Sequence, residues 1–240
     1  MNEHRHEIPM RWADIDSLNH VNNVVYLEYA AQAEHALIAD RVVERRRPGS
    51  VMVEFSRPIQ LSRRPVEVVT QVRADSLVQR IGVRGSDRVF ATVTSSFGAP
   101  GHVEPAAGVA ERPLTLRPSD LDHDGSVSVP RVFELLQESR IPYMATLLPS
   151  GPGGVVLATV AVDLVRPITG DDVVESRAWV DRLGTSSYAI GAQLVVDGAV
   201  SVSSLAVLVG FDPAPQRSRA LSGAEREGVA RRHAGQEADA

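Results

Sequence analysis

Residues 11–29 read RWADIDSLNHVNNVVYLEY, and the interpretation of the whole chain works outward from this stretch. It begins with the pattern of a strand, passes through a polar turn and ends with the pattern of a helix. Aspartate and histidine are the usual acid–base residues of enzymes, and the start of a helix offers N–H groups and a positive partial charge to a developing oxyanion. We therefore predict that this turn forms half of an active site. Its polar residues are Asp14, Asp16, Asn19, His20, Asn22 and Asn23.

The residues on either side of this turn predict a strand before it and a helix after it. A short strand is expected at residues 7–12, and Asn22 or Asn23 can cap a helix that runs to about residue 39. Apolar side chains at helical spacing include Tyr26 and Tyr29, so core packing is the first interpretation of both tyrosines. Aspartate and asparagine are also common in solvated turns, which is the plain alternative to a catalytic role.

The composition predicts a soluble cytoplasmic protein. The 240 residues are 43% hydrophobic and 23% charged, which allows a buried core in one large domain or two smaller ones. A net charge of -5 argues against nucleic acid as the main partner. The chain has no cysteine, which excludes disulfides, thiolate nucleophiles and thiolate metal sites. We expect no membrane span and no signal peptide, because no apolar run has the necessary length.

The plan of the first half of the chain recurs in the second half. Each copy has a turn of the form D-x-D, then a helix pattern, then a long β-rich region. Three anchors in the same order at a nearly constant offset indicate an internal repeat. The matched anchors are Asp14 and Asp16 with Asp120 and Asp122 (106 residues later), residues 57–59 with 166–168 (109 later), and residues 66–67 with 174–175 (108 later).

This repeat predicts the domain organisation. Repeat 1 is expected at 1–98, a linker at 99–112, repeat 2 at 113–212 and a flexible tail at 213–240. The tail is assigned because its sequence has few large apolar residues. In repeat 2, Pro142 is expected to kink or end the helix.

The motif of repeat 1 resembles the 4-hydroxybenzoyl-CoA thioesterase family. That family shows the pattern R-W-x-D-x-D-x-x-x-H-V-N-N-x-x-Y-x-x-Y, although a Gly usually stands where this chain has Asn19. In repeat 2, the segment Gln137-Glu138-Ser139-Arg140 resembles the E-E-A-R helix segment of the family. A tandem of two such units, here over about residues 7–211, resembles the double-hotdog acyl thioesterases, which include the acyl-ACP thioesterases. The matching residues of repeat 1 are Arg11, Trp12, Asp14, Asp16, His20, Val21, Asn22, Asn23, Tyr26 and Tyr29.

The resemblance implies an α+β fold and a reaction. The fold is a double hotdog, in which each repeat wraps an antiparallel β-sheet around a long central helix and the repeats pack as an intramolecular pseudo-dimer. The reaction is hydrolysis of an acyl thioester to a free acid and a thiol. The expected substrate is acyl-coenzyme A or an acyl carrier protein (ACP), with no cofactor and no metal. The chain is expected as a monomeric pseudo-dimer or a homo-oligomer.

The resemblance also implies roles for individual residues. The catalytic carboxylate falls on Asp16, which could act as a general base on water or as a nucleophile. His20 could orient water, accept a proton or bind the thioester carbonyl. Asn23 and Glu138 complete the expected catalytic set. Asn22 and Tyr26 are expected to bind substrate.

The two repeats depart from the family pattern in complementary ways. Repeat 1 has Gln32 at the position of the helix acid, and repeat 2 has Ser126 and Val129 in place of histidine and the second asparagine. We expect one composite site, with the loop from repeat 1 and Glu138 from repeat 2. The alternative is drift, in which repeat 2 is only a scaffold and Glu138 is solvated.

Other functions and sites stay open at this stage. A hotdog hydratase or dehydratase acting on acyl-CoA and a non-catalytic acyl-binding protein are the alternatives to a thioesterase. Residues 120–124 hold three aspartates and a histidine that could suggest a metal, but their spacing favours a surface turn. The arginines at 45–47 and 63–64 could bind the phosphates of coenzyme A, although a solvated basic surface is favoured.

Overall fold

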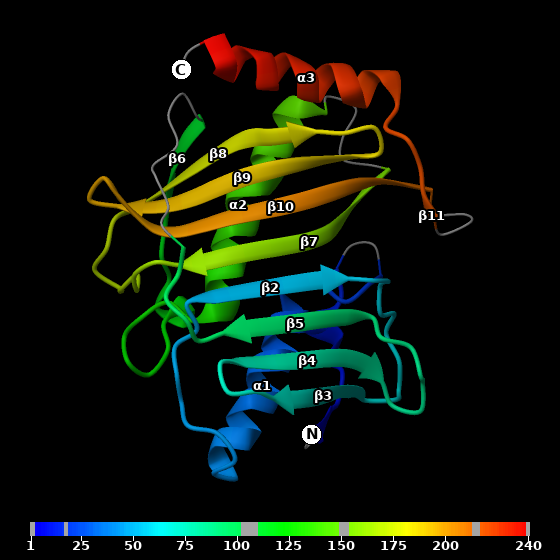
Figure 1. Cartoon of the computed structure of the whole chain (residues 1–240), viewed down its shortest axis with the longest axis vertical. Coiled ribbons are helices and arrows are strands. Elements are labelled where there is room, and N and C mark those ends of the chain that lie inside the picture. Colours follow the sequence, from blue (N-terminus) through cyan, green and yellow to red (C-terminus); the bar gives the residue numbers. More distant parts are fainter. Residues whose placement is uncertain (1–2, 17–18, 102–109, 149–153, 213–216, 239–240) are drawn as a thin grey trace. The chain divides into compact units, whose positions relative to one another are not determined.

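A computed structural model describes residues 3–16, 19–101, 110–148, 154–212 and 217–238. At residues 110 and 234–238 it describes the backbone alone. The chain divides into two compact units, unit 1 at Met1–Pro100 and unit 2 at Gly101–Ala240 (Figure 1). Within the described ranges, no helix combines the length and the apolarity that crossing a lipid bilayer requires. Each unit contains its own antiparallel sheet and its own long helix.

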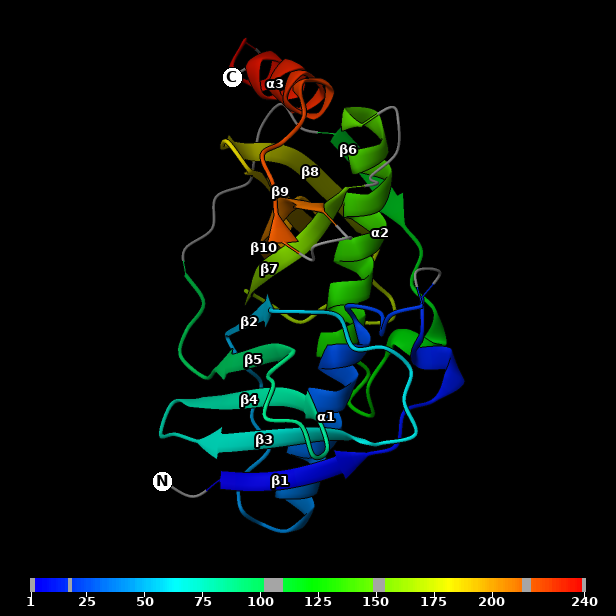
Figure 2. The same ribbon diagram turned by 90° about the vertical axis from the view of Figure 1, so that its right-hand side faces the viewer.

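Unit 1 packs one helix against one face of an antiparallel sheet, as Figure 2 shows. Its strands lie in the order β1-β3-β4-β5-β2. The helix α1 contacts β1, β3, β4 and β5. The elements are β1 (Glu3–Ile8), the 3-10 turn η1 (Trp12–Asp14), α1 (Val25–Ala39), β2 (Ser50–Phe55), β3 (Val66–Val72), β4 (Ser76–Val83) and β5 (Ala91–Ser96).

Side-chain periodicity explains the packing of unit 1. Val66 and Val68 of β3 are fully buried, whereas Glu67 and Val69 are half-buried. Successive side chains of a strand point to opposite faces, which explains this alternation. The small residues Ala30 and Ala33 of α1 are also buried, which lets the helix approach the sheet closely. Gln79 of β4 donates to the Ala30 carbonyl at 2.8 Å, so a buried amide is satisfied at the same contact.

Unit 2 repeats this plan and extends it. Its strands lie in the order β7-β10-β9-β8-β6, with β11 paired to β10, and the helix α2 contacts β8 and β9. The elements are β6 (Ala110–Leu114), the 3-10 turn η2 (Pro118–Asp120), α2 (Val129–Leu147), β7 (Val155–Leu164), β8 (Val174–Leu183), β9 (Ser187–Val196), β10 (Ala199–Asp212), β11 (Arg217–Ser218) and α3 (Gly223–Ala238).

The two units share one topology. When β6, η2, α2, β7, β8, β9 and β10 are matched in chain order to β1, η1, α1, β2, β3, β4 and β5, the sheet order is the same in both units. The predicted α+β plan, with a helix and an antiparallel sheet in each repeat, is therefore confirmed. Most of the predicted linker, residues 102–109, lies outside the described residues.

One local prediction differs from the structure, and the structure excludes one of the two outcomes expected at Pro142. The strand predicted at 7–12 lies earlier, at Glu3–Ile8, because Pro9 lacks a backbone donor and Trp12 belongs to η1. Pro142 does not end its helix, since α2 continues to Leu147. Leu147 is fully buried in the core of unit 2, and this burial holds the last turn of α2 in spite of the proline.

The prediction of a flexible tail at 213–240 is wrong for its described part. The segment carries α3, and Val229 of this helix is fully buried in the core of unit 2. A side chain at Gly228 would place its Cβ 1.9 Å from the Leu147 carbonyl oxygen, so glycine permits the close approach of α3. Arg219 pairs with the Glu225 carboxylate at 2.8 Å and also donates to a backbone carbonyl. Gly228 and the ion pair of Arg219 with Glu225 therefore dock α3. Neither feature produces a strong apolar periodicity in the sequence, which is why the pattern did not predict docking.

Candidate active site

The polar turn ahead of α1 closes on itself through Asp16 and His20. The Asp16 N–H donates to the His20 carbonyl at 2.8 Å, and the His20 N–H donates to Asp16 Oδ1 at 3.1 Å. Asn19 closes the turn with a φ of 59° and donates to the Asp16 carbonyl at 3.1 Å. Asparagine is the side chain that best tolerates this left-handed region after glycine, so Asn19 can replace the glycine of the family pattern. The loop thus fixes the orientation of the Asp16 carboxylate.

The connection between β2 and β3 anchors this loop from the other side. The Val21 N–H donates to the carbonyl of the fully buried Ile59 at 2.8 Å. His20 forms a single β-bridge with Gln60. The Ile59 N–H in turn donates to the hydroxyl oxygen of Tyr26, on α1, at 2.9 Å. The turn, the helix and the β2–β3 connection therefore hold one another in a single arrangement.

Asp14 supports the turn. Its Oδ2 accepts from the Arg11 N–H and from the Tyr29 hydroxyl, both at 2.7 Å. Burial, together with the neighbouring Asp14, raises the pKa of Tyr29, so this hydroxyl stays protonated and keeps donating. These contacts hold the turn in place, and they give Tyr29 a polar role beyond core packing.

The two asparagines at the start of α1 are used differently. Asn22 Oδ1 accepts from the Val24 N–H at 3.0 Å, and the Asn22 carbonyl accepts from the Val25 N–H at 2.9 Å. Asn22 therefore shapes the turn just ahead of α1, whose N-cap position is Val24. Asn23 is half-buried, and its side chain has no hydrogen-bond partner within the described part of unit 1. Its amide is the one that can turn toward a substrate.

Tyr26 connects the helix to the electrostatics of Asp16. Its side chain is 1% exposed and meets the Phe55 ring edge-on, with ring centroids 5.5 Å apart. Burial raises the pKa of Tyr26 to about 12, and the negative charge of Asp16 adds to the increase. The hydroxyl is therefore neutral at physiological pH and lies within electrostatic range of the Asp16 carboxylate. Because its oxygen accepts from Ile59, its own proton is available for donation.

The structure brings five of the predicted site residues together in unit 1, and the sixth belongs to unit 2. Asp16, His20, Asn22, Asn23 and Tyr26 all lie in the turn or in the first part of α1. The sixth, Glu138, is exposed on α2 in unit 2, as is Gln32 at the matching position of α1. The role of Glu138 remains a prediction from the sequence. No group of three or more metal-binding side chains occurs among the residues that the structure describes.

The matching loop of unit 2 has the same backbone with other side-chain contacts. The Asp122 N–H donates to the Ser126 carbonyl at 2.7 Å, and Gly125 takes the left-handed position with a φ of 79°. The Asp122 carboxylate, however, accepts from the backbone and the ring of His123, at 2.8 Å each. The Ser126 N–H donates to Asp124 instead. This agrees with the expectation of a surface turn at residues 120–124.

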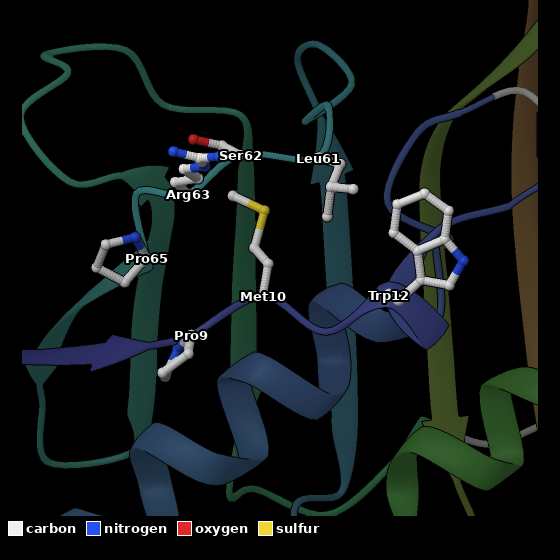
Figure 3. A pocket seen from close by; sticks show the side chains of 7 residues that line it. All are labelled: Pro9, Met10, Trp12, Leu61, Ser62, Arg63 and Pro65. Carbon is white, nitrogen blue, oxygen red and sulfur yellow. The ribbon is translucent and has the colours of Figure 1, made fainter.

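A hollow of about 600 Å³ opens in unit 1 beside η1, as Figure 3 shows. The motif singled out Trp12, but sequence reasoning did not identify this hollow. Trp12 is 82% exposed, and a large aromatic residue within a polar turn was the available indication. The lining residues are Pro9, Met10, Trp12, Leu61, Ser62, Arg63 and Pro65.

Two family models match parts of the chain. Residues 1–97 match the acyl-ACP thioesterase C-terminal domain, and residues 124–201 match the thioesterase superfamily. The first match covers the whole loop from Asp14 to Tyr26. No curated protein matches the sequence closely enough to count as a relative.

Solved structures similar to the chain include three that match most of its length. A protein assigned as an oleoyl thioesterase from Lactobacillus plantarum has a TM-score of 0.67 at 12% identity and covers 88% of this chain and 96% of its own. The 12:0-ACP thioesterase from Umbellularia californica has a TM-score of 0.65 at 13% identity, with 90% and 98% covered. An acyl-ACP thioesterase from Bacteroides thetaiotaomicron has a TM-score of 0.58 at 12% identity, with 86% and 97% covered. The chain therefore has the hotdog-like fold of thioesterases, and both units contain a stretch that matches a thioesterase family model.

Proposed function

We propose that this protein is an acyl thioesterase that hydrolyses an acyl thioester of coenzyme A or of an acyl carrier protein. The observation that carries the proposal is the closed loop of Asp16 and His20 directly ahead of α1. This loop lies in the part of the chain that matches the acyl-ACP thioesterase C-terminal domain. The double-hotdog pairing of the two units, as a pseudo-dimer, stays part of this proposal.

Asp16 supplies the base or the nucleophile in the proposed reaction. In the first route, the carboxylate takes a proton from water, and the resulting hydroxide adds to the thioester carbonyl carbon. In the second route, the carboxylate itself adds to that carbon, and water later hydrolyses the anhydride. In both, the carbon–sulfur bond breaks and the thiolate leaves, to be protonated to the free thiol. The His20 N–H on Asp16 Oδ1 orients the carboxylate for either route.

The start of α1 supplies stabilisation for the oxyanion. The N–H groups of Val24, Val25 and Leu27 already donate to Asn22 or Val24, so the helix contributes the positive partial charge of its dipole. Asn23 adds an amide donor at the same end, and Tyr26 adds a neutral hydroxyl. A preorganised donor of this kind typically contributes a rate factor of roughly a hundred or more.

A thiol-release assay tests the proposal directly. The chain contains no cysteine, so a disulfide reagent that reports free thiol gives no background from the protein. Acyl-CoA esters of increasing chain length and aromatic acyl-CoA esters should release thiol above the spontaneous rate, and the best substrate then defines the acyl group.

The same samples separate the alternative functions. A hydratase would consume the double bond of an enoyl-CoA without releasing thiol. A non-catalytic acyl-binding protein would bind acyl-CoA tightly and turn over none of the esters. Either result, with the well-folded protein inactive in thiol release toward both CoA and carrier-protein esters, contradicts the proposed function.

A further inference from the structure

The hollow beside η1 has the size and the lining of a small-molecule site. Its volume of about 600 Å³ lies within the range typical of ligand pockets, roughly 300–1,000 Å³. Five of its seven lining residues are apolar or aromatic, and Arg63 contributes a cation. Figure 3 shows the side chain of Met10 near the middle of the hollow, with Trp12 and Arg63 on opposite sides of it in this view.

Trp12 offers an exposed flat surface. Its side chain is 82% exposed, whereas Trp179, the other tryptophan of the chain, packs on Gly191 so closely that a Cβ there would lie 2.2 Å from the indole. Leaving a large aromatic side chain in water costs hydrophobic free energy. A planar base stacked on an aromatic side chain typically gains roughly 1–3 kcal/mol. Trp12 is therefore suited to hold a flat heteroaromatic ring.

Arg63 offers a free charge beside this ring site. On the sheet of unit 1, Arg5, Arg80 and Arg84 each form an ion pair with a glutamate. Arg63 is exposed and has no hydrogen-bond or ion-pair partner among the described residues, and its neighbour Arg64 makes only a backbone contact. A guanidinium pairs well with phosphate. The hollow thus combines an aromatic face with an unpaired phosphate-binding group.

The hollow is directly connected to the candidate active site. Leu61 and Arg63 follow Gln60, which forms the β-bridge with His20. On the other side, Trp12 begins η1, which ends at Asp14. A ligand seated on Trp12 and Arg63 therefore lies next to the segments that hold the catalytic loop, and a flexible arm from it can lead toward Asp16.

We propose that this hollow binds the adenine nucleotide of a coenzyme A thioester, with Trp12 stacked on the adenine and Arg63 paired with a phosphate. This inference rests on the proposed function, because it assigns the carrier of the acyl group. It selects coenzyme A over a carrier protein. A hollow of this size fits one nucleotide, and its lining includes the cation Arg63 for a phosphate.

Tryptophan fluorescence tests the binding step. Coenzyme A and adenosine 3′,5′-bisphosphate should quench the emission of Trp12, and pantetheine, which lacks the nucleotide, should not. Quenching should persist in Trp179→Phe and disappear in Trp12→Phe. By calorimetry, Trp12→Ala and Arg63→Ala should each weaken coenzyme A binding about tenfold, the loss expected for one stacking or one charged contact. Arg73→Ala, which removes the same charge at the opposite end of β3, should change binding less than twofold.

Competing substrates separate this inference from the proposed function. Arg63→Ala should lower kcat/KM about tenfold more for an acyl-CoA than for the matching acyl-pantetheine. Equal effects on the two esters, in an active enzyme, overturn the nucleotide site and leave the thioesterase intact. A larger effect on an acyl carrier protein ester than on acyl-CoA overturns it in favour of protein docking. Tighter binding of ADP than of coenzyme A overturns it in favour of a separate nucleotide. Nucleotide quenching without any thiol release leaves the binding site and rejects the thioesterase.

Discussion

The loop before α1 and the loop before α2 have the same backbone and different chemistry. Equivalent hydrogen bonds join Asp16 with His20 and, 106 residues later, Asp122 with Ser126. In unit 1 the Asp16 carboxylate accepts from the His20 backbone within its own loop. In unit 2 the Asp122 carboxylate turns to its neighbour His123 and is exposed. The comparison shows that the fold fixes the main chain of the loop and leaves the direction of the carboxylate to local side chains.

The helices that follow the two loops also differ in their side chains. The positions of Tyr26 and Tyr29 on α1 are taken by Val132 and Leu135 on α2, and all four side chains are buried. Both tyrosines make polar contacts, one with the backbone of Ile59 and the other with Asp14. Unit 1 thus places hydroxyl groups behind its loop, whereas unit 2 fills the same positions with apolar side chains. This difference favours unit 1 as the chemical half of the chain.

Unit 2 instead carries an additional structural element. Val229 of its helix α3, together with Leu221 just before this helix, joins a core cluster that also contains Tyr188. In the described part of unit 1, no comparable helix follows β5, and an open hollow lies beside η1. Two copies of one topology therefore carry different additional features, and the predictions below compare them.

The largest expected effect separates the two aspartates. Asp16→Asn keeps the shape of the side chain and removes its basicity, so turnover of the best acyl thioester should fall about a hundredfold or more. Asp122→Asn, the matched change in the other loop, should alter turnover less than twofold. Steady-state thiol release, with circular dichroism to check folding, measures both. Equal losses in two folded variants would show that both loops are active and would end the functional distinction between the units.

The second prediction concerns the stability that α3 gives to unit 2. The Arg219 guanidinium and the Ser222 N–H lower the pKa of Glu225 to about 2. Glu225→Gln should therefore reduce the free energy of unfolding at pH 7 by roughly 2 kcal/mol, as expected for lost charge-assisted hydrogen bonds. Because the folded pKa is depressed, this stabilisation is complete above the ordinary pKa near 4.5 and fades as pH falls toward 2.

Urea unfolding as a function of pH checks this prediction. The difference in unfolding free energy between the wild type and Glu225→Gln should be constant from pH 7 to about 5 and should decrease below pH 4. The exposed Glu227 of the same helix provides the matched control, and Glu227→Gln should change stability by less than about 0.5 kcal/mol. If this difference in unfolding free energy persists at pH 2, the carboxylate charge does not hold α3.

Sequence reasoning could predict the repeated plan because short-range patterns encode it. The D-x-D turns, the helix patterns and the β-branched strands all recur in order, and each has a local physical cause. The same reasoning gave a flexible tail where the structure has α3. Helix docking there depends on the approach of Gly228 to Leu147 and on the donation from Arg219 to the Gly154 carbonyl. Both contacts join residues that are distant in sequence. Deletion of this tail should therefore destabilise unit 2.

The candidate site was predictable for a related reason. Asp16, His20, Asn22, Asn23 and Tyr26 lie within eleven consecutive positions, so one motif places them together. The hollow was not predictable, because it requires the segment at 61–65 to fold against the segment at 9–12. Such a contact depends on the tertiary path of the chain.

The third prediction compares the two helix positions that the family pattern assigns to an acid. Glu138→Gln should lower kcat/KM about tenfold if unit 2 contributes a residue to the reaction, while Gln32→Ala should change it less than twofold. Both side chains are exposed, so neither change should affect folding by more than about 0.5 kcal/mol. A thiol-release assay measures kcat/KM of each variant relative to the wild type. An unchanged Glu138→Gln enzyme would leave all catalytic groups in unit 1 and support unit 2 as a scaffold.

The smallest expected effect is the coupling between Asp14 and Tyr29, which has no counterpart behind the loop of unit 2. Tyr29→Phe removes one hydroxyl from Asp14 Oδ2 and leaves the Arg11 N–H bound there. It should lower the free energy of unfolding by about 1 kcal/mol, the usual net value of one hydrogen bond. Asp14→Asn in the Tyr29→Phe background should then cost about 1 kcal/mol less than in the wild type, since the shared contact is already gone. Turnover should fall only a few-fold in Tyr29→Phe, because the hydroxyl bonds Asp14 and supports the turn. Purely additive unfolding energies would show that Asp14 fixes the loop without Tyr29, and a hundredfold loss of turnover would make Tyr29 part of the chemistry.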